Sequence, residues 1–320
     1  MYTLQGKRKN ITMKFGEFIR SCREHLNLTQ EQLVHALYLF NDELFHGLDT
    51  TTISKWERSI TQPKASKQLK ILQFFQQEQH KALPCFDTYS VPENEKHICQ
   101  IGVKNLIIGK RKDLVLNFPS QMMTLENLTL TQVRHIERMN VFLEVAADMR
   151  NSVHPSYTQI TESQLYQWAL HPSNLFLVCQ YKGFIIGFLF VLRLKPEIQQ
   201  QILHFDKAFS ELIAENFSSF DEPGGYIITH FFAWNDKSAT LLIIRYYAHL
   251  IANQHNITSI GAAVYYEEGK EILANMNLHT LDTYTENGIE ITSYYETLSN
   301  ILLNENVVKM LFRKDTCPEE

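Results

Sequence analysis

Two short helices, each opened by a strong capping residue, constrain the N-terminal part of this chain more than any other feature. Thr29 precedes an apolar-periodic stretch, and Gln32 three residues later can return a hydrogen bond to the backbone of the capping residue. Asp49 precedes a second stretch, in which Ile53 and Trp56 share one face. We therefore predict that both stretches are helices with one buried face.

A third helix precedes these two. Its apolar residues recur at helical spacing and form one stripe: Phe15, Phe18, Ile19, Cys22 and Leu26. Asn27 follows the stripe, and Asn tolerates the left-handed conformation that commonly ends a helix. The spacing predicts helices over about 15–26 and 30–39, and another that begins after Asp49.

Together these helices resemble the lambda-repressor-like (XRE-type) helix-turn-helix over about residues 14–76. Arg23 and Glu57 are similar to a pair that links the first and third helices in that family, and we interpret them as structural. The chain departs from the family pattern in a longer connection near residues 40–47, and in Ser59, which stands where Gly is usual. The resemblance implies an all-α DNA-binding domain over residues 1–80.

The same resemblance implies which residues contact DNA. The family places its third helix in the major groove, where Thr50, Thr51, Ser54 and Lys55 would form the outward face. Short hydroxyls can contact base edges, and a lysine can reach guanine acceptors or a phosphate. Gln30 would contact a phosphate or an end base. For each Thr or Ser the alternative is a capping role at the helix start.

Charge and cysteine usage agree with a DNA-reading head joined to a different body. Residues 1–80 carry 11 Lys and Arg against 8 Asp and Glu, whereas the remainder carries 19 against 27. No secretory signal is recognisable, and the scattered histidines predict no metal site. The five cysteines lack the C-x-x-C spacing, and we expect reduced thiols in a cytoplasmic protein: Cys22, Cys85, Cys99, Cys179 and Cys317. The longest apolar run, at residues 184–192, is too short to span a membrane and predicts a buried strand.

Residues 81–125 are expected to form a connector. Pro84 and Pro92 indicate an exposed linker, and residues 103–115 have a strand-like pattern around a basic turn at residues 109–113. We expect a solvated hairpin turn there, and insertion of the basic turn into a minor groove is the alternative.

From about residue 126 the pattern alternates between helices and strands. Helices are predicted over 131–149, 162–170, 198–217, 238–254 and 267–276. Strands are predicted over 175–181, 184–194, 225–233, 257–264, 279–284 and 289–295. This order resembles the GNAT acyltransferase fold over about residues 125–315. The predicted fold is thus multidomain, with an α/β (α+β) domain over 126–320 that has a mixed, mostly antiparallel sheet.

In the GNAT family two central strands splay apart, which here would be 225–233 and 257–264, and acyl-CoA inserts between them. Its diphosphate binds backbone N–H groups at the start of the following helix. Here that loop is Trp234–Thr240, which has none of the usual glycines. Ala239 can replace the last small residue, Lys237 and Ser238 could contact a phosphate, and Asp236 opposes an anion.

The catalytic acid that the family uses is also missing. The matching position holds Leu273, which cannot donate a proton, although Tyr265 and Tyr266 lie one turn earlier and could replace it. Aromatic residues around this region could line an apolar cleft or simply fill the core: Phe231, Phe232, Trp234, Tyr246, Tyr247, Tyr265 and Tyr266. The candidate ligand-binding residues are Trp234, Lys237, Ser238, Ala239, Tyr265 and Tyr266, with no catalytic residue assigned.

We interpret the chain as a homodimeric transcriptional regulator that binds a double-stranded DNA operator. Its C-terminal domain would sense a small, acyl-containing ligand, with acyl-CoA as a candidate and no certain cofactor. One alternative is an active N-acyltransferase with a DNA-binding head. Another is an antitoxin-like scaffold that binds DNA and a protein partner.

Overall fold

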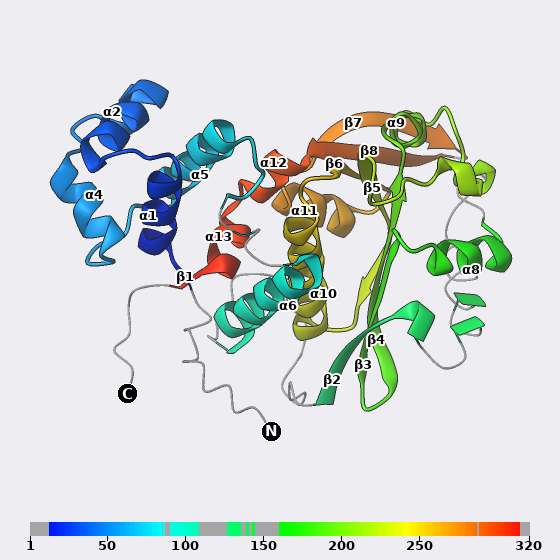
Figure 1. The fold of residues 1–320 in the computed structure, drawn as a ribbon. Coiled ribbons are helices and arrows are strands. Elements are labelled where there is room, and N and C mark those ends of the chain that lie inside the picture. The colour runs from blue at the N-terminus through cyan, green and yellow to red at the C-terminus, as the bar shows by residue number, and fades with distance from the viewer. Residues whose placement is uncertain are drawn as a thin grey trace. The chain divides into compact units, whose positions relative to one another are not determined.

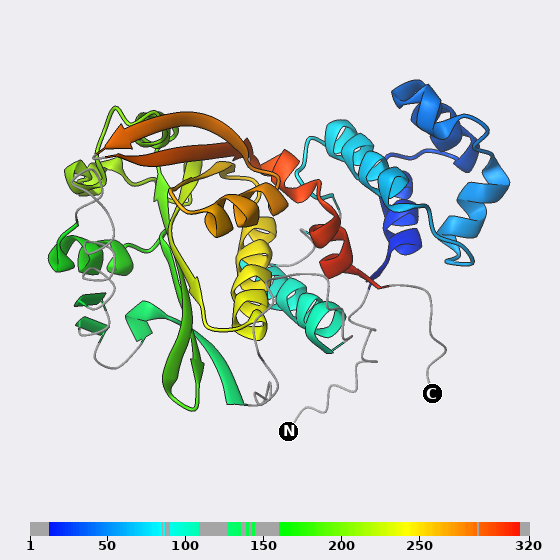
Figure 2. The same cartoon turned by 180° about the vertical axis from the view of Figure 1, so that it is seen from behind.

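The computed structural model describes residues 13–84, 86, 90–108, 127–135, 139–140, 143–144, 160–286 and 288–313. The chain forms two compact units, whose elements are labelled in Figure 1 and seen from behind in Figure 2. Of the described residues, the first unit takes those up to Ile108, the segment Tyr247–Ala252 and those from Glu305 onward. Among the described residues, no helix combines the length and apolarity needed to cross a membrane.

The first unit is helical. It contains α1 (Phe15–His25), α2 (Gln30–Phe40), α3 (Asp42–Phe45), α4 (Thr50–Glu57), α5 (Ala65–Gln79) and α6 (Val91–Gly102), followed by the π-helical turn η1 (Val103–Ile108). Its core is built from the predicted apolar stripes, because Phe15, Phe18 and Ile19 of α1 are fully buried, as are Leu33 and Leu37 of α2.

The predicted capping interactions are present. Gln32 N donates to Thr29 Oγ1 at 3.1 Å, and Thr29 N donates to Gln32 Oε1 at 2.8 Å. Asp49 Oδ1 accepts from Thr52 N at 2.6 Å. Asn27 has φ +56°, so it ends α1 in the left-handed conformation that its residue type predicts.

The longer connection after α2 holds the short helix α3. Asn41 caps it, with Oδ1 accepting from Leu44 N at 2.8 Å, and Phe45 anchors it in the core at 1% exposure. After α4, Ser59 adopts φ +56°. This left-handed backbone is the conformation in which Gly is usual, and Ser59 adopts it with the strain that a side chain adds.

The prediction of an exposed linker and a strand was wrong for residues 91–108. Val91–Gly102 is helix α6, and Val103–Ile108 is a π-helical turn. Pro92 is compatible with a helix here because it lies in the first turn, where its missing N–H needs no partner. Ile98 and Ile101, three residues apart, are both buried. The basic turn at residues 109–113 lies outside the described residues.

The C-terminal end of the described chain completes the core of the first unit. After α13 (Glu305–Leu311), the strand β9 (Phe312–Arg313) pairs in parallel with β1 (Met13–Lys14). The Phe312 ring, 4% exposed, lies 4.9 Å from the Phe15 ring and 5.2 Å from the Phe18 ring. Residues almost 300 positions apart in sequence therefore share one aromatic cluster.

The second unit is built on a seven-stranded sheet in the order β2-β3-β4-β5-β6-β8-β7. β5 and β6 pair in parallel, and the other neighbours in this order pair antiparallel, so the sheet is mixed as predicted. The strands are β2 (Leu128–Gln132), β3 (Leu175–Tyr181), β4 (Phe184–Leu194), β5 (Gly224–Ala233), β6 (Ile257–Val264), β7 (His279–Glu286) and β8 (Ile289–Thr297).

Helices lie on both faces of this sheet (Figures 1 and 2). On one face α8 (Glu162–Leu170) and α9 (Pro196–Leu203) pack over an apolar core that includes Trp168, Phe190 and Leu203. On the other face lie α11 (Glu267–Asn275) and the part of α10 (Asp236–Ala252) up to Tyr246. Leu298–Leu302 forms α12.

Two helix predictions in this region were wrong in part. Thr131 and Gln132 end strand β2, and residues 133–135 form a 3-10 turn, η3; residues 136–138, 141–142 and 145–149 of that prediction lie outside the described residues. The helix predicted over 198–217 is α9 followed by the short 3-10 turns η5 (Phe209–Glu211) and η6 (Ala214–Asn216). Phe205, with φ +62°, marks the break, because a left-handed residue cannot continue a right-handed helix.

We expect Phe312→Ala to destabilise the first unit by about 3–5 kcal/mol, because it removes a buried aromatic ring and leaves a cavity. Hydrogen–deuterium exchange of peptides from α1 and α5 would measure the loss as faster exchange. Phe184→Ala is a matched control, because Phe184 is 76% exposed and lies in the second unit. Equal protection of α1 in both variants would contradict the proposed role of Phe312.

Candidate functional site

The two central strands of the sheet separate along their length. β5 and β6 pair in parallel from Gly224 and Ile257 as far as Ile228 and Ala262. Beyond this point β5 continues to Ala233 beside β4 only, and β6 continues to Val264 beside β8. The C-terminal halves of two adjacent strands thus diverge and open a wedge in the sheet.

A buried arginine holds the closed end of this wedge. Arg193 on β4 is 0% exposed, and its Nη2 donates to the carbonyl of Glu222 at 2.8 Å and to that of Asn256 at 2.7 Å. Gly224 N donates to the same Asn256 carbonyl at 2.9 Å. These bonds tie together the segments that lead into β5 and β6, so the strands can separate only at their other ends.

A bulge in β5 marks the start of the divergence. Phe190 pairs with His230 whereas Val191 pairs with Ile228, so Thr229 is an extra residue on β5. Its Oγ1 donates to the Phe190 carbonyl at 3.1 Å. Bulges increase local twist, and this one turns the end of β5 away from β6.

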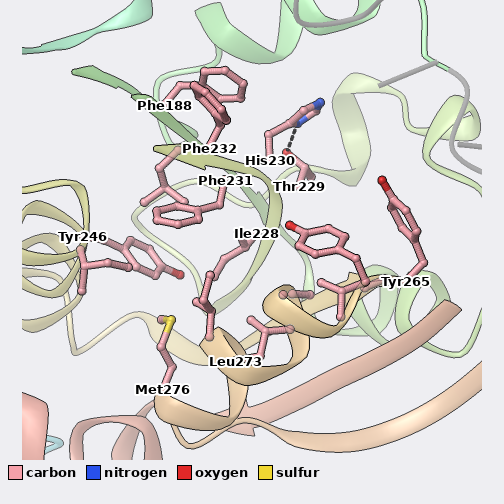
Figure 3. A pocket seen from close by; sticks show the side chains of 18 residues that line it. Phe188, Ile228, Thr229, His230, Phe231, Phe232, Tyr246, Tyr265, Leu273 and Met276 are labelled. Carbon is pink, nitrogen blue, oxygen red and sulfur yellow. Dashed lines mark hydrogen bonds between the residues drawn. The ribbon is translucent and has the colours of Figure 1, made fainter. Parts of the chain in front are cut away.

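The wedge contains a pocket of about 230 Å³. Figure 3 shows its wall, in which Phe188, Phe232 and His230 lie on one side of the sheet, and Tyr246 and Met276 on the other. The complete lining is Phe188, Leu189, Ile228, Thr229, His230, Phe231, Phe232, Ile243, Tyr246, Ala262, Ala263, Val264, Tyr265, Tyr266, Gly269, Ile272, Leu273 and Met276.

Two adjacent tyrosines, Tyr265 and Tyr266, belong to this mostly apolar wall. The rings of Tyr265 and Tyr266 meet edge to face, 5.2 Å apart. Gly269 makes room for them, because a Cβ there would lie 2.8 Å from the Tyr266 ring. Burial, helped by the neighbouring Tyr265 and Glu268, raises the pKa of Tyr266 above its ordinary value of 10, so its hydroxyl keeps its proton at neutral pH.

The loop that the GNAT resemblance assigns to a diphosphate is closed by its own side chains. Ser238 N donates to Asn235 Oδ1 at 2.8 Å, and Ser238 Oγ donates to the Asn235 carbonyl at 2.9 Å. Asp236 stands in the first turn of α10, and its buried Oδ1 has no hydrogen-bond partner within the described structure. A ligand diphosphate at this helix start would compete for the Ser238 N–H and would lie near the Asp236 carboxylate. The residues present therefore do not fit the nucleotide part of acyl-CoA.

The structure brings together two of the six residues predicted for ligand binding. Tyr265 and Tyr266 lie in the pocket wall, whereas the other four are outside the lining. Ser238 and Ala239 are fully buried, and Trp234 is 64% exposed. Lys237 is partly exposed on the first turn of α10.

Most of the pocket wall is not recognisable from the sequence. Of the aromatic residues suggested for a cleft, Phe231, Phe232 and Tyr246 do line the pocket. The aliphatic residues of α11 that face it have the same 3–4 residue spacing as any core helix. His230 gave no signal either, and its Nδ1 lies 3.0 Å from the Thr229 hydroxyl.

In the first unit, the residues predicted to contact DNA lie on α4 and at the start of α2. Thr50, Thr51 and Lys55 are exposed and Ser54 is partly exposed, while Ile53 and Trp56 of the same helix are buried. Helix α4 therefore presents its polar face to solvent from a fixed position.

A buried carboxylate holds α1, α2 and α4 together. Glu57, 3% exposed, accepts from Arg23 Nε at 2.6 Å and Nη2 at 3.1 Å. Its side-chain hydrogen bond to Arg23 raises the pKa of that guanidinium. Gln30 Nε2 donates to Glu57 Oε2 at 2.8 Å, so its amide is part of this network. The predicted Arg23–Glu57 link is confirmed.

No protein-family model matches the sequence, and a search of curated proteins finds no match. Solved structures similar to part of the chain include an N-acetyltransferase from Staphylococcus aureus Mu50 (13% identity, TM-score 0.36), which covers 54% of this chain and 99% of that one. Arabidopsis thaliana Naa50 in complex with a bisubstrate analogue shows 9% identity and a TM-score of 0.35, and covers 53% of this chain and 98% of that one.

FeeM, an N-acyl amino acid synthase from uncultured soil microbes, shows 5% identity and a TM-score of 0.36, and covers 54% of this chain and 91% of that one. Likeness of this extent assigns neither activity nor ligand. Any function assigned to this chain must therefore come from its own strand order, wedge and pocket.

We expect Ser238→Ala to destabilise the second unit by about 1 kcal/mol, because the buried start of α10 loses its reciprocal cap. Urea denaturation monitored by circular dichroism would measure the change. Ser210→Ala is the matched control, since Ser210 is exposed. A stability loss no larger than that of the control would mean that the cap contributes nothing to α10.

Proposed function

We propose that this chain is a DNA-binding transcriptional regulator with a ligand pocket in its second unit. The exposed polar face of α4 carries the proposal. Thr50, Thr51 and Lys55 lie there on a helix whose opposite face is anchored by buried Ile53 and Trp56. A rigid helix that presents hydroxyls and a lysine is suited to contacts with base edges and phosphates in a major groove.

The arrangement of α1 to α4 supports the resemblance to the XRE-type helix-turn-helix. The caps at Thr29 and Asp49 fix where α2 and α4 begin, and Glu57 links α4 to α1 through Arg23 and to α2 through Gln30. In this proposal the protein acts as a homodimer on a near-palindromic operator whose half-sites lie about one helical turn apart. Gln30 lies at the first position of α2 and would contact a phosphate or an end base, with its amide shared between Glu57 and DNA.

The second unit is proposed to be a GNAT-like domain that acts as a sensor. Its strand order, with β5 and β6 as the parallel pair that opens into a wedge, is what the resemblance to that family implies. A mostly apolar pocket with a few polar groups is suited to a small ligand. Such a ligand would regulate DNA binding only if it binds one arrangement of the two units better than the other.

We expect Lys55→Ala and Thr51→Ala each to weaken operator binding by about 1–3 kcal/mol, because each removes a contact at the DNA interface. Fluorescence anisotropy with a duplex selected from a random pool would measure the affinity. Lys270→Ala is the control, because Lys270 lies on α11 and pairs with Glu267. Unchanged binding by both variants, in folded protein, would overturn the assignment of α4 as the reading helix.

An acyltransferase is the second candidate, favoured by the protonated Tyr266 in the pocket wall. A transferase would need a proton donor there, so Tyr265→Phe or Tyr266→Phe would lower the rate of acyl transfer about 100-fold or more. We expect instead no turnover of acetyl-CoA with amine acceptors by the unaltered protein. Turnover that either variant abolishes would support the enzyme over the sensor.

A further inference from the structure

The wedge pocket contains no fully charged side chain. None of its 18 lining residues is Asp, Glu, Lys or Arg, and its side-chain polar groups belong to Thr229, His230, Tyr246, Tyr265 and Tyr266. A ligand carboxylate or ammonium would leave water without gaining an ion pair, which is costly in an apolar site. A neutral ligand loses little and can still use the hydroxyls for orientation.

The pocket is partly open to solvent, so its volume sets the size of the ligand part that it can enclose. An apolar cavity of about 150 Å³ holds a benzene molecule. By that measure the 230 Å³ of the wedge pocket takes a ligand of roughly nine non-hydrogen atoms. A short aliphatic chain with one polar end matches this volume and the aromatic and aliphatic wall.

The turn before α10 uses several of its backbone N–H groups within its own structure, which leaves fewer of them for a diphosphate. Three of its backbone N–H groups are already bonded within the turn: Asn235 N to Ser238 Oγ, Ser238 N to Asn235 Oδ1, and Ala239 N to the Asn235 carbonyl. The charges of Asp236 and Lys237 cancel, so the turn gives an anion no net attraction beyond the helix dipole. The buried Asp236 oxygen without a hydrogen-bond partner in the described structure would repel a phosphate directly.

We propose that the wedge pocket binds a neutral, phosphate-free aliphatic molecule of about nine non-hydrogen atoms in place of an acyl-CoA thioester. The inference rests on the proposed role of this pocket as the ligand site of a sensor. It separates two functions of the fold, because the strand wedge that can hold an aliphatic chain is retained while the helix start that would hold a nucleotide is closed. The second unit accordingly binds a ligand that has no acyl group to transfer.

Three probes with the same aliphatic chain test the proposal: heptanamide, heptanoate and heptanoyl-CoA. Isothermal titration of the full chain should show saturable binding of heptanamide, with heptanoate about tenfold weaker or more because its carboxylate must be desolvated. Heptanoyl-CoA should show no saturable binding. Binding of heptanoyl-CoA as tight as that of heptanamide, or no binding of heptanamide, overturns the proposal.

A matched pair of substitutions locates the binding. Ala263 lines the pocket, and Ala263→Leu should abolish heptanamide binding by filling the wedge. Ala274 lies exposed on α11 outside the lining, and Ala274→Leu should leave the affinity unchanged. Retained binding in Ala263→Leu would place heptanamide elsewhere and overturn the assignment.

The double substitution Asn235→Gly with Asp236→Asn tests the exclusion of the nucleotide. It frees the Ser238 N–H and removes the negative charge, so saturable binding of heptanoyl-CoA should appear in this variant while the affinity for heptanamide stays constant. No gain in folded protein would overturn the role given to the closed turn.

Failure of this ligand assignment can be distinguished from failure of the proposed regulator function. DNA affinity is measured separately by anisotropy, with and without heptanamide. Absence of any DNA binding would refute the regulator while leaving the heptanamide titration intact. Tight heptanoyl-CoA binding would refute the present inference even if the protein binds its operator.

Discussion

Parallel pairing of β5 and β6 that ends at Ile228 and Ala262 is the constraint on which the second unit depends. Arg193 fixes the paired end by bonding the segments that enter both strands, and Thr229 twists β5 away at the other end. Beyond Ile228 and Ala262, β5 stays paired with β4 and β6 stays paired with β8, so each strand that borders the wedge is held along its outer edge. A pocket forms because the diverging strands leave a space that the side chains of α11 line but do not fill.

In the first unit, one buried carboxylate and one aromatic ring connect segments that are far apart in the sequence. Glu57 joins α1, α2 and α4, and because it is buried, loss of Arg23 would leave its charge with only the more distant Arg20, at 3.9 Å. Phe312 closes the aromatic cluster of α1 from the opposite end of the chain. The helices that we propose to read DNA therefore depend on residues that lie after the second unit in sequence.

The sequence predicted a helix or strand correctly where capping or turn residues mark the two ends of the segment. Glu162–Leu170, Leu175–Tyr181, Phe184–Leu194 and Ile257–Val264 have the predicted bounds, because caps and turns such as Lys182-Gly183 punctuate them. The prediction failed where one residue type is compatible with two kinds of local structure. Pro92 indicated a linker but starts helix α6, because proline is as suitable in a first helical turn as in a loop.

The sequence by itself determined the capped helices, the exposed face of α4 and the absence of glycines before α10, because these depend on residues within one or two turns of each other. Only the tertiary structure decided that Thr229, His230 and Met276 share one pocket, and that one carboxylate oxygen of Asp236 at the start of α10 is buried. It also decided that Phe312 belongs to the N-terminal core. Such contacts join segments far apart in the chain, and apolar periodicity states that a face is buried without stating what buries it.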